Sequence, residues 1–417
     1  MSLLIDKNDE QANTQKIKQL IRRVYLYAIF NFFLVALVGV LLRTIQFSGI
    51  GSVYYKNILQ AHSHMALGGW IMPALLALVL KFYPEIGCRV AYRHWRNIAV
   101  LIFVSAYGML FSFPFQGYGS VSIVFSTLSI LASYYLAFIV WKIRSETGKT
   151  VSGKFLIAGL FYLVLSSIGP FATVPLIIMG KAGSIIYFDA IYFYLHFQYN
   201  GWFSFLLLGI LYKIFSASKN SNANIVFTLL NIACIPAFFL STLWGKPPVI
   251  FYFISAVAAF LQLAALFFLL KDFVRAKGNG IQFHVLLHIA LLIFSVKLIL
   301  QFAGAFPAIA DMSYQHRNFI IAYLHFVLIG FVSLFIFGSM ATIFTSTWKY
   351  RFAMGLFLFA FMLTEGILFV QALSEKFVLR FADFNKWILA ASCLFPMALF
   401  MIWYETLQTK NEIKAEL

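Results

Sequence analysis

The sequence predicts an all-α, polytopic membrane protein with twelve transmembrane helices, and two observations lead to that fold class. Of the 417 residues, 62% are hydrophobic and only 11% are charged, whereas about 25% of the residues in an ordinary soluble domain are charged. The apolar residues also form long continuous runs, and a helix that crosses a bilayer needs about 20 of them. A soluble enzyme, a disordered protein and a free nucleic-acid-binding protein are therefore excluded. A transmembrane β-barrel is excluded too, because its strands alternate apolar and polar residues.

The apolar runs predict one transmembrane domain over residues 23–405, between an N-terminal segment 1–22 and a C-terminal tail 406–417. The predicted spans are 23–42, 58–82, 96–115, 119–142, 153–179, 184–212, 224–243, 248–270, 281–302, 318–343, 352–373 and 387–405. The links between them are too short to hold a soluble domain.

The net charge of +17 predicts how these spans are oriented. If the N-terminus is cytoplasmic, the inner segments hold 22 of the 31 Lys and Arg residues, the outer segments hold 8, and Lys297 lies within a span. Cytoplasmic loops of membrane proteins carry such an excess of basic residues. We therefore expect both termini in the cytoplasm, a location in the cytoplasmic (inner) membrane, and no nucleic-acid partner.

Three histidines share one local pattern. His64, His196 and His325 are each followed five residues later by glycine and then by an aromatic residue, at spacings of 132 and 129 residues. They fall on the second, sixth and tenth predicted spans, which run in the same direction, and at similar depth. This recurrence predicts three four-helix units around a pseudo-threefold axis. The glycine would let another helix or a bulky group approach the backbone closely.

Intramembrane histidines of this kind indicate a ligand-binding role. Polar groups at that depth are costly and are usually functional, and neutral imidazole ligates haem iron, copper or zinc. The alternative is that each histidine only bonds a neighbouring helix, which the threefold match disfavours. The chain has no HExxH motif, and its three cysteines are isolated, so no zinc motif is present. Two histidines on facing helices can clamp a haem from both sides.

With these residues on predicted helices 2, 6 and 10, the chain resembles the haem–copper oxidase subunit I superfamily, in particular its cbb-type oxidase and nitric oxide reductase branch. The resemblance implies one low-spin haem b, with His325 of helix 10 as one axial ligand. Helix 2 supplies the other ligand, either His64 or His62. The repeat selects His64, which we expect to be the ligand; the run Met72-Pro-Ala-Leu, like that of aa-type oxidases, selects His62 as the alternative. The two histidines point about 200° apart around a helix, so only one of them can face the haem.

The chain departs from the family at the oxygen-reducing centre. Tyr323 stands where the family has the ligand of the high-spin haem, and predicted helix 7 (224–243) contains no histidine pair. His196 is the one histidine left of the three expected at the copper centre. The resemblance therefore implies a degenerate member that lacks the binuclear centre, with copper binding not expected.

Charged residues near the outer ends of the spans are further candidates. Arg317 lies at the outer mouth of helix 10, and Arg380 lies in the outer loop 374–386, where the family also places arginines. The resemblance implies that they bind haem propionates, and the alternative is an ordinary surface loop. Lys297 and Glu365 lie within predicted spans, either as an ion pair or as a propionate partner or proton-relay site.

The sequence therefore predicts an integral membrane haem protein that transfers electrons or handles haem or nitric oxide, with other respiratory subunits or an electron donor as partners. Two alternatives remain open. One is an active oxidase or nitric oxide reductase whose remodelled centre uses His196 and Tyr323 as ligands. The other is a non-haem transporter or metal-binding protein in which the three repeated histidines line a path.

Overall fold

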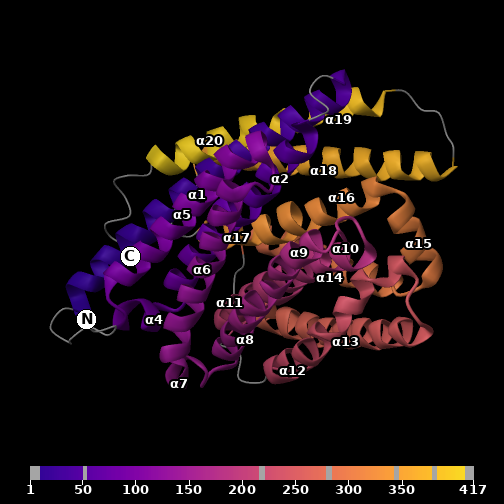
Figure 1. Cartoon of the computed structure of the whole chain (residues 1–417). Coiled ribbons are helices and arrows are strands. Elements are labelled where there is room, and N and C mark those ends of the chain that lie inside the picture. Colours follow the sequence, from indigo (N-terminus) through magenta and orange to yellow (C-terminus); the bar gives the residue numbers. More distant parts are fainter. Residues whose placement is uncertain are drawn as a thin grey trace. The chain divides into compact units, whose positions relative to one another are not determined.

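The computed structural model describes residues 10–49, 54–215, 221–278, 284–341, 347–377 and 383–408. Every regular element in these ranges is a helix, and they contain no strand (Figure 1). The predicted all-α class is therefore confirmed.

Ten helices in the described ranges are long and apolar enough to cross a membrane. They are Glu10–Ser48, Tyr55–Phe82, Tyr92–Gln116, Ser120–Lys142, Val151–Ile178, Val249–Gly278, Val285–Ala303, Asn318–Met340, Trp348–Ser374 and Phe384–Gln408. Each overlaps one of the twelve predicted spans. The chain is thus an integral membrane protein in contact with the lipid bilayer.

The other two predicted spans differ from a simple apolar helix. The span predicted over 184–212 is helical, but polar side chains such as His196, Gln198 and Asn200 interrupt its apolar run. The span predicted over 224–243 begins as α12 (Ala223–Cys234) and continues as short 3-10 segments from Pro236 onward. Proline has no backbone N–H and does not continue an α-helix. The count of twelve spans and the pseudo-threefold arrangement stay predictions.

The helices form two compact units, and the first comprises residues 1–136 and 336–417. Its elements are α1 (Glu10–Ser48), α2 (Tyr55–His64), the π-helix η3 (Met65–Ile71), α3 (Met72–Phe82), α4 (Pro84–Arg89), α5 (Tyr92–Gln116), α6 (Ser120–Lys142), α17 (Leu334–Met340), α18 (Trp348–Phe377), α19 (Phe384–Ser392) and α20 (Leu394–Gln408). The helices α6 and α17 run across the boundary to the second unit. The first and last helices, α1 and α20, pack together.

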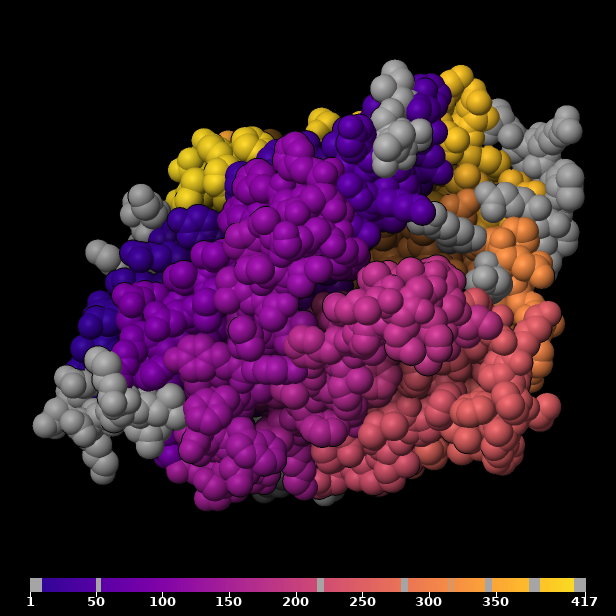
Figure 2. Space-filling view, in the orientation of Figure 1, coloured from indigo at the N-terminus to yellow at the C-terminus, as the bar shows by residue number. Residues whose placement is uncertain are grey.

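Aromatic rings fill the core of the first unit. Phe32 of α1 stacks on Trp70 of η3 with ring centroids 4.6 Å apart, and Phe337 and Phe357 lie against the same rings. Such pairs add to the free energy of burying their area. Figure 2 shows one face of the molecule in space-filling form, in the orientation of Figure 1.

The second unit comprises residues 137–335. Its elements are α7 (Arg144–Thr147), α8 (Val151–Ser166), α9 (Ile168–Ile178), α10 (Ile185–His196), the π-helix η4 (Phe197–Phe203), α11 (Ser204–Phe215), α12 (Ala223–Cys234), the 3-10 helices η5 (Pro236–Ser241) and η6 (Leu243–Gly245), α13 (Val249–Gly278), α14 (Val285–Ala303), α15 (Pro307–Gln315), α16 (Arg317–His325) and the π-helix η7 (Phe326–Ser333).

A buried carboxylate ties three parts of this second unit together. Asp272 of α13 is only 2% exposed and accepts hydrogen bonds from the Tyr212 hydroxyl at 3.1 Å and from the backbone and side-chain amides of Asn222, both at 2.7 Å. A buried charge is tolerated when it is hydrogen-bonded in this way. Asp272 therefore anchors the chain just before α12 to α11 and α13.

Candidate functional site

The three repeated histidines occupy the same place in local structure. His64 ends α2, His196 ends α10 and His325 ends α16, and a π-helix follows directly in each case. A π-helix is rare and is frequently found at functional sites. The sequence repeat is thus accompanied by a repeat of backbone geometry, which was not predicted.

Side chains satisfy carbonyl groups within these wider turns. In the second unit, the Ser204 hydroxyl donates to the carbonyl of Tyr199 at 2.6 Å, and the Ser333 hydroxyl donates to the carbonyl of Leu328 at 2.8 Å. Both serines come eight residues after the histidine of their motif and bond the carbonyl five residues back. In the first unit, Asn31 of α1 donates its side-chain amide to the carbonyl of Gly69 at 2.8 Å. The recurrent serine is the one sequence signal that sequence reasoning missed here.

His62 is held by a backbone carbonyl through one of its two ring nitrogens. Its Nδ1 lies 3.0 Å from the backbone carbonyl of Val35 on α1, so Nδ1 carries the proton and donates it. Gly39 makes room for the ring, because a Cβ there would lie 3.2 Å from Cε1 of His62. Among the described residues, no group bonds Nε2. A metal-ligating histidine typically donates its other ring N–H to a carbonyl in this manner.

His64 is held differently. Its Nε2 lies 3.1 Å from the hydroxyl of Tyr118, and its ring stacks on Phe113 with centroids 4.6 Å apart. Its Nε2 is therefore already engaged by a neighbour. The two histidines face different helices, α1 for His62 and the end of α5 for His64, as their predicted angular separation requires.

His196 uses both ring nitrogens within the protein. It is 1% exposed, its Nε2 lies 2.8 Å from the carbonyl of Cys234, and the side-chain amide of Asn200 donates to its Nδ1 at 3.1 Å. The carbonyl is available because the helix tightens after α12, where the N–H of Phe238 bonds Ile235 instead of Cys234. His196 thus joins α10 to the end of α12 as a neutral imidazole.

A polar network extends from His196 through the interior of the second unit. The side-chain amide of Gln301 on α14 donates to Asn200 at 3.3 Å. Lys297, one turn earlier on α14, is 1% exposed and lies over the rings of Tyr199 and Phe294, with its Nζ 5.9 and 5.2 Å from their centroids. Such contacts stabilise a buried cation. The predicted intramembrane charge of Lys297 therefore belongs to the surroundings of His196.

A small cavity lies within this network. It has a volume of about 10 Å³ and is bordered by Asn200, Cys234, Gln262 and Lys297 among others, and a space of that size holds about one water molecule. The side-chain oxygen of Gln262, which is 4% exposed, has no hydrogen-bond partner among the described residues. The polar residues that surround Lys297 were not found from the sequence.

The candidates on the tenth predicted span (318–343) lie mainly on α16. His325 is its last residue and is partly buried. The buried hydroxyl of Tyr323 has no hydrogen-bond partner among the described residues, and its ring meets the edge of Tyr199 at 6.2 Å. Arg317 begins α16, but its side chain lies outside the described part, as does the whole of Arg380.

Glu365 of α18 lies close enough to Arg43 of α1, within the first unit, for their charges to interact. Lys297 belongs to the second unit, so an ion pair between Lys297 and Glu365 stays a prediction.

The predicted axial pair takes one histidine from each unit, His62 or His64 from the first and His325 from the second. The pair stays a prediction. Within the ranges that the structure describes, no three His, Cys, Asp or Glu side chains gather closely enough to hold a metal ion. In comparisons with known proteins, no family model and no curated protein matches the chain.

Proposed function

We propose that the chain is an integral membrane protein that resembles cytochrome oxidase subunit I and binds one low-spin haem b through two histidines. In this proposal, twelve spans form three four-helix units in the cytoplasmic membrane, with both termini in the cytoplasm. The excess of Lys and Arg in the inner segments supports the orientation. An electron donor or other respiratory subunits are the expected partners.

The observation that carries the proposal is the hydrogen bonding of His62. Its Nδ1 proton is held by the carbonyl of Val35, and this fixes both the tautomer and the direction in which Nε2 points. His64 lacks this arrangement, because Tyr118 already bonds its Nε2. We therefore assign His62 and His325 as the axial pair, with His64 as the alternative on the same helix.

The residues around His62 and His196 decide which chemistry the proposed haem site can support. The carbonyl of Val35 accepts the Nδ1 proton of His62, so that the neutral ring has its lone pair on Nε2, and Gly39 lets the ring lie against α1. A haem with two histidine ligands supplies one-electron transfer, since no coordination position is left open. The binuclear centre is not part of the proposal, because both nitrogens of His196 are bonded within the protein. We expect no stoichiometric copper and no oxygen reduction.

The test is a reduced-minus-oxidised optical spectrum of the purified chain, together with the haem and copper content per chain. We expect one six-coordinate, low-spin haem b. His62→Ala and His325→Ala should each yield a high-spin or haem-free protein, whereas His64→Ala should keep the low-spin spectrum. His94→Ala is the matched control, because His94 bonds Tyr135 near the start of α5.

Two results would overturn the proposal. One is a chain without haem after expression with ample haem, and the other is haem-dependent reduction of oxygen to water. If His64→Ala abolishes the low-spin spectrum and His62→Ala spares it, the haem is kept but the helix 2 ligand is reversed. External imidazole should restore six-coordination to His62→Gly, which separates loss of a ligand from loss of the fold.

A second candidate function is that of a non-haem membrane protein with a polar path through its interior. The specific observation in its favour is the buried network of Lys297, Asn200 and Gln301 beside a water-sized cavity, since buried charges within a membrane usually mark ion or proton pathways. Haem-free protein would favour this candidate. The remodelled-reductase alternative would need Tyr323, whose hydroxyl has no partner in the described part, and a second haem per chain would support it.

A further inference from the structure

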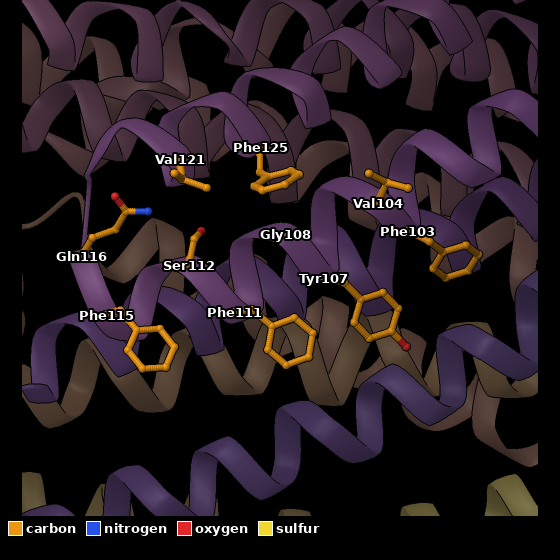
Figure 3. Close-up of a pocket in the computed structure, with 10 residues that line it drawn as sticks. All are labelled: Phe103, Val104, Tyr107, Gly108, Phe111, Ser112, Phe115, Gln116, Val121 and Phe125. Carbon is orange, nitrogen blue, oxygen red and sulfur yellow. The ribbon is translucent and has the colours of Figure 1, made fainter.

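A groove of about 690 Å³ runs along α5 and α6 of the first unit (Figure 3). One side is a row of four aromatic rings at every fourth position of α5, from Phe103 to Phe115, and the other side is formed by Val121 and Phe125 of α6. Gly108 lies between them, and a Cβ there would lie 2.2 Å from the ring of Phe125. The glycine therefore allows Phe125 to lie against α5 as one side of the groove.

The environment of this groove is the bilayer itself. Both helices are membrane spans, and the rings of Phe111 and Phe115 are 66% and 85% exposed. In a span, such exposed rings face lipid. The groove extends from Phe103 to Gln116, which is about 20 Å along a helix. Half of a hydrocarbon core of about 30 Å is about 15 Å, so the groove covers one leaflet from the interface to the middle of the membrane.

The interfacial end of the groove is polar. Gln116 is the last residue of α5 and is exposed. One turn earlier, Ser112 is 8% exposed, and its hydroxyl has no hydrogen-bond partner among the described residues. Figure 3 shows both side chains on the side of α5 that faces Val121 and Phe125. A buried hydroxyl without a partner is unfavourable, so an acceptor at this end would stabilise the structure.

We propose that this groove binds one glycerophospholipid from the leaflet at the C-terminal end of α5. One acyl chain lies along the row of rings, and an ester carbonyl accepts hydrogen bonds from the Ser112 hydroxyl and the Gln116 amide. The ester carbonyls of a bilayer lie at the boundary of its hydrocarbon core, which is where the span ends. The site is independent of the haem proposal, because no candidate haem ligand borders the groove.

The experiment uses the full chain in nanodiscs of a phosphatidylcholine with a photoreactive group midway along one acyl chain. After irradiation, mass spectrometry of peptides gives the labelling of α5 and α6 relative to α18. The outer face of α18 is the internal reference, because Phe359 and Met362 are 58% and 68% exposed. We expect several-fold more label in the groove than on α18. Ser112→Leu, which fills the floor, should abolish the excess, and Ser112→Ala should reduce it.

Gly355→Leu is the matched control, since a Cβ at Gly355 on α18 would meet open space. It should leave the groove labelling unchanged. Equal labelling of the groove and α18 would overturn the proposal, because it would indicate ordinary annular lipid. An excess that persists in Ser112→Leu would also overturn it. Less label in the groove than on α18 would overturn it as well, because it would show that a helix of a second copy covers the groove instead.

Discussion

Replacing Asn31 should destabilise the first unit by an amount that the structure allows us to estimate. Asn31 is completely buried, donates to the carbonyl of Gly69 at 2.8 Å and accepts from the Tyr107 hydroxyl at 2.7 Å. Hydrogen bonds between membrane helices contribute about 0.6 kcal/mol on average and up to about 1.7 kcal/mol each. Leucine has a similar volume but removes both bonds. We therefore expect Asn31→Leu to lower the free energy of unfolding by about 1–3 kcal/mol.

A double-mutant cycle tests this estimate. Tyr107→Phe removes only the hydroxyl and should lower the stability by about 1 kcal/mol. Asn31→Leu alone leaves the Tyr107 hydroxyl without its acceptor, and the double variant lacks that hydroxyl. The loss of stability in the double variant should therefore be smaller than the sum of the two single losses. The assay is reversible unfolding in mixed micelles, with Tyr27→Phe as a control for an exposed tyrosine on α1. An Asn31→Leu variant as stable as the wild type, or strictly additive losses, would refute the reasoning.

Three further changes have outcomes that follow from the structure. Asp272→Ala orphans three donors and should lower the unfolding free energy by about 3–5 kcal/mol, with Asp272→Asn losing less, as chemical unfolding would show. Gly201→Ala should lower the unfolding free energy by about 1–3 kcal/mol, because its Cβ would lie 2.4 Å from the Cβ of Tyr162. Gly69→Ala should lower it less, because the new Cβ meets only the flexible side chain of Met65. Equal losses of stability in the two variants would contradict this. Burial lowers the pKa of His284, which caps the N-terminus of α14. The unfolded chain then binds the proton more readily, so stability should fall as the pH drops through about 6.5. His284→Asn should remove that part of the pH dependence of the melting temperature.

The fold class and ten of the spans were predictable because length and apolar content alone decide whether a helix can cross a bilayer. The common local position of His64, His196 and His325 was predictable as well, since the repeat carried it. The π-helical winding after each histidine was not. A serine eight residues later, such as Ser204, accompanies it in two of the three cases and is its one local signal. After His64 the carbonyl of Gly69 is instead bonded by Asn31 of another helix, which no local pattern indicates.

Some contacts of the histidines could likewise be predicted from the sequence, and others could not. The bond between Asn200 and His196 follows from a spacing of four residues on one helix face. Its second partner is the carbonyl of Cys234, 38 residues away from the histidine, and this carbonyl is available because of how the backbone tightens near Pro236. The preference for His62 over His64 likewise rests on the backbone carbonyl of Val35 on α1. Every residue has a backbone carbonyl, so the sequence does not indicate which one a histidine will bond.

The π-helix after each histidine also changes the phase of its span. An α-helix turns by about 100° per residue, and a π-turn takes one residue more before its hydrogen bond closes. Residues on either side of η3, η4 or η7 are therefore offset by about one residue from the positions that an unbroken α-helix would give them. The segment before the histidine and the segment after it can each present an apolar stripe to a different neighbour. Deleting one residue within η4 should restore α-helical winding at the expense of that offset, and α11 would then turn its stripe away from α8.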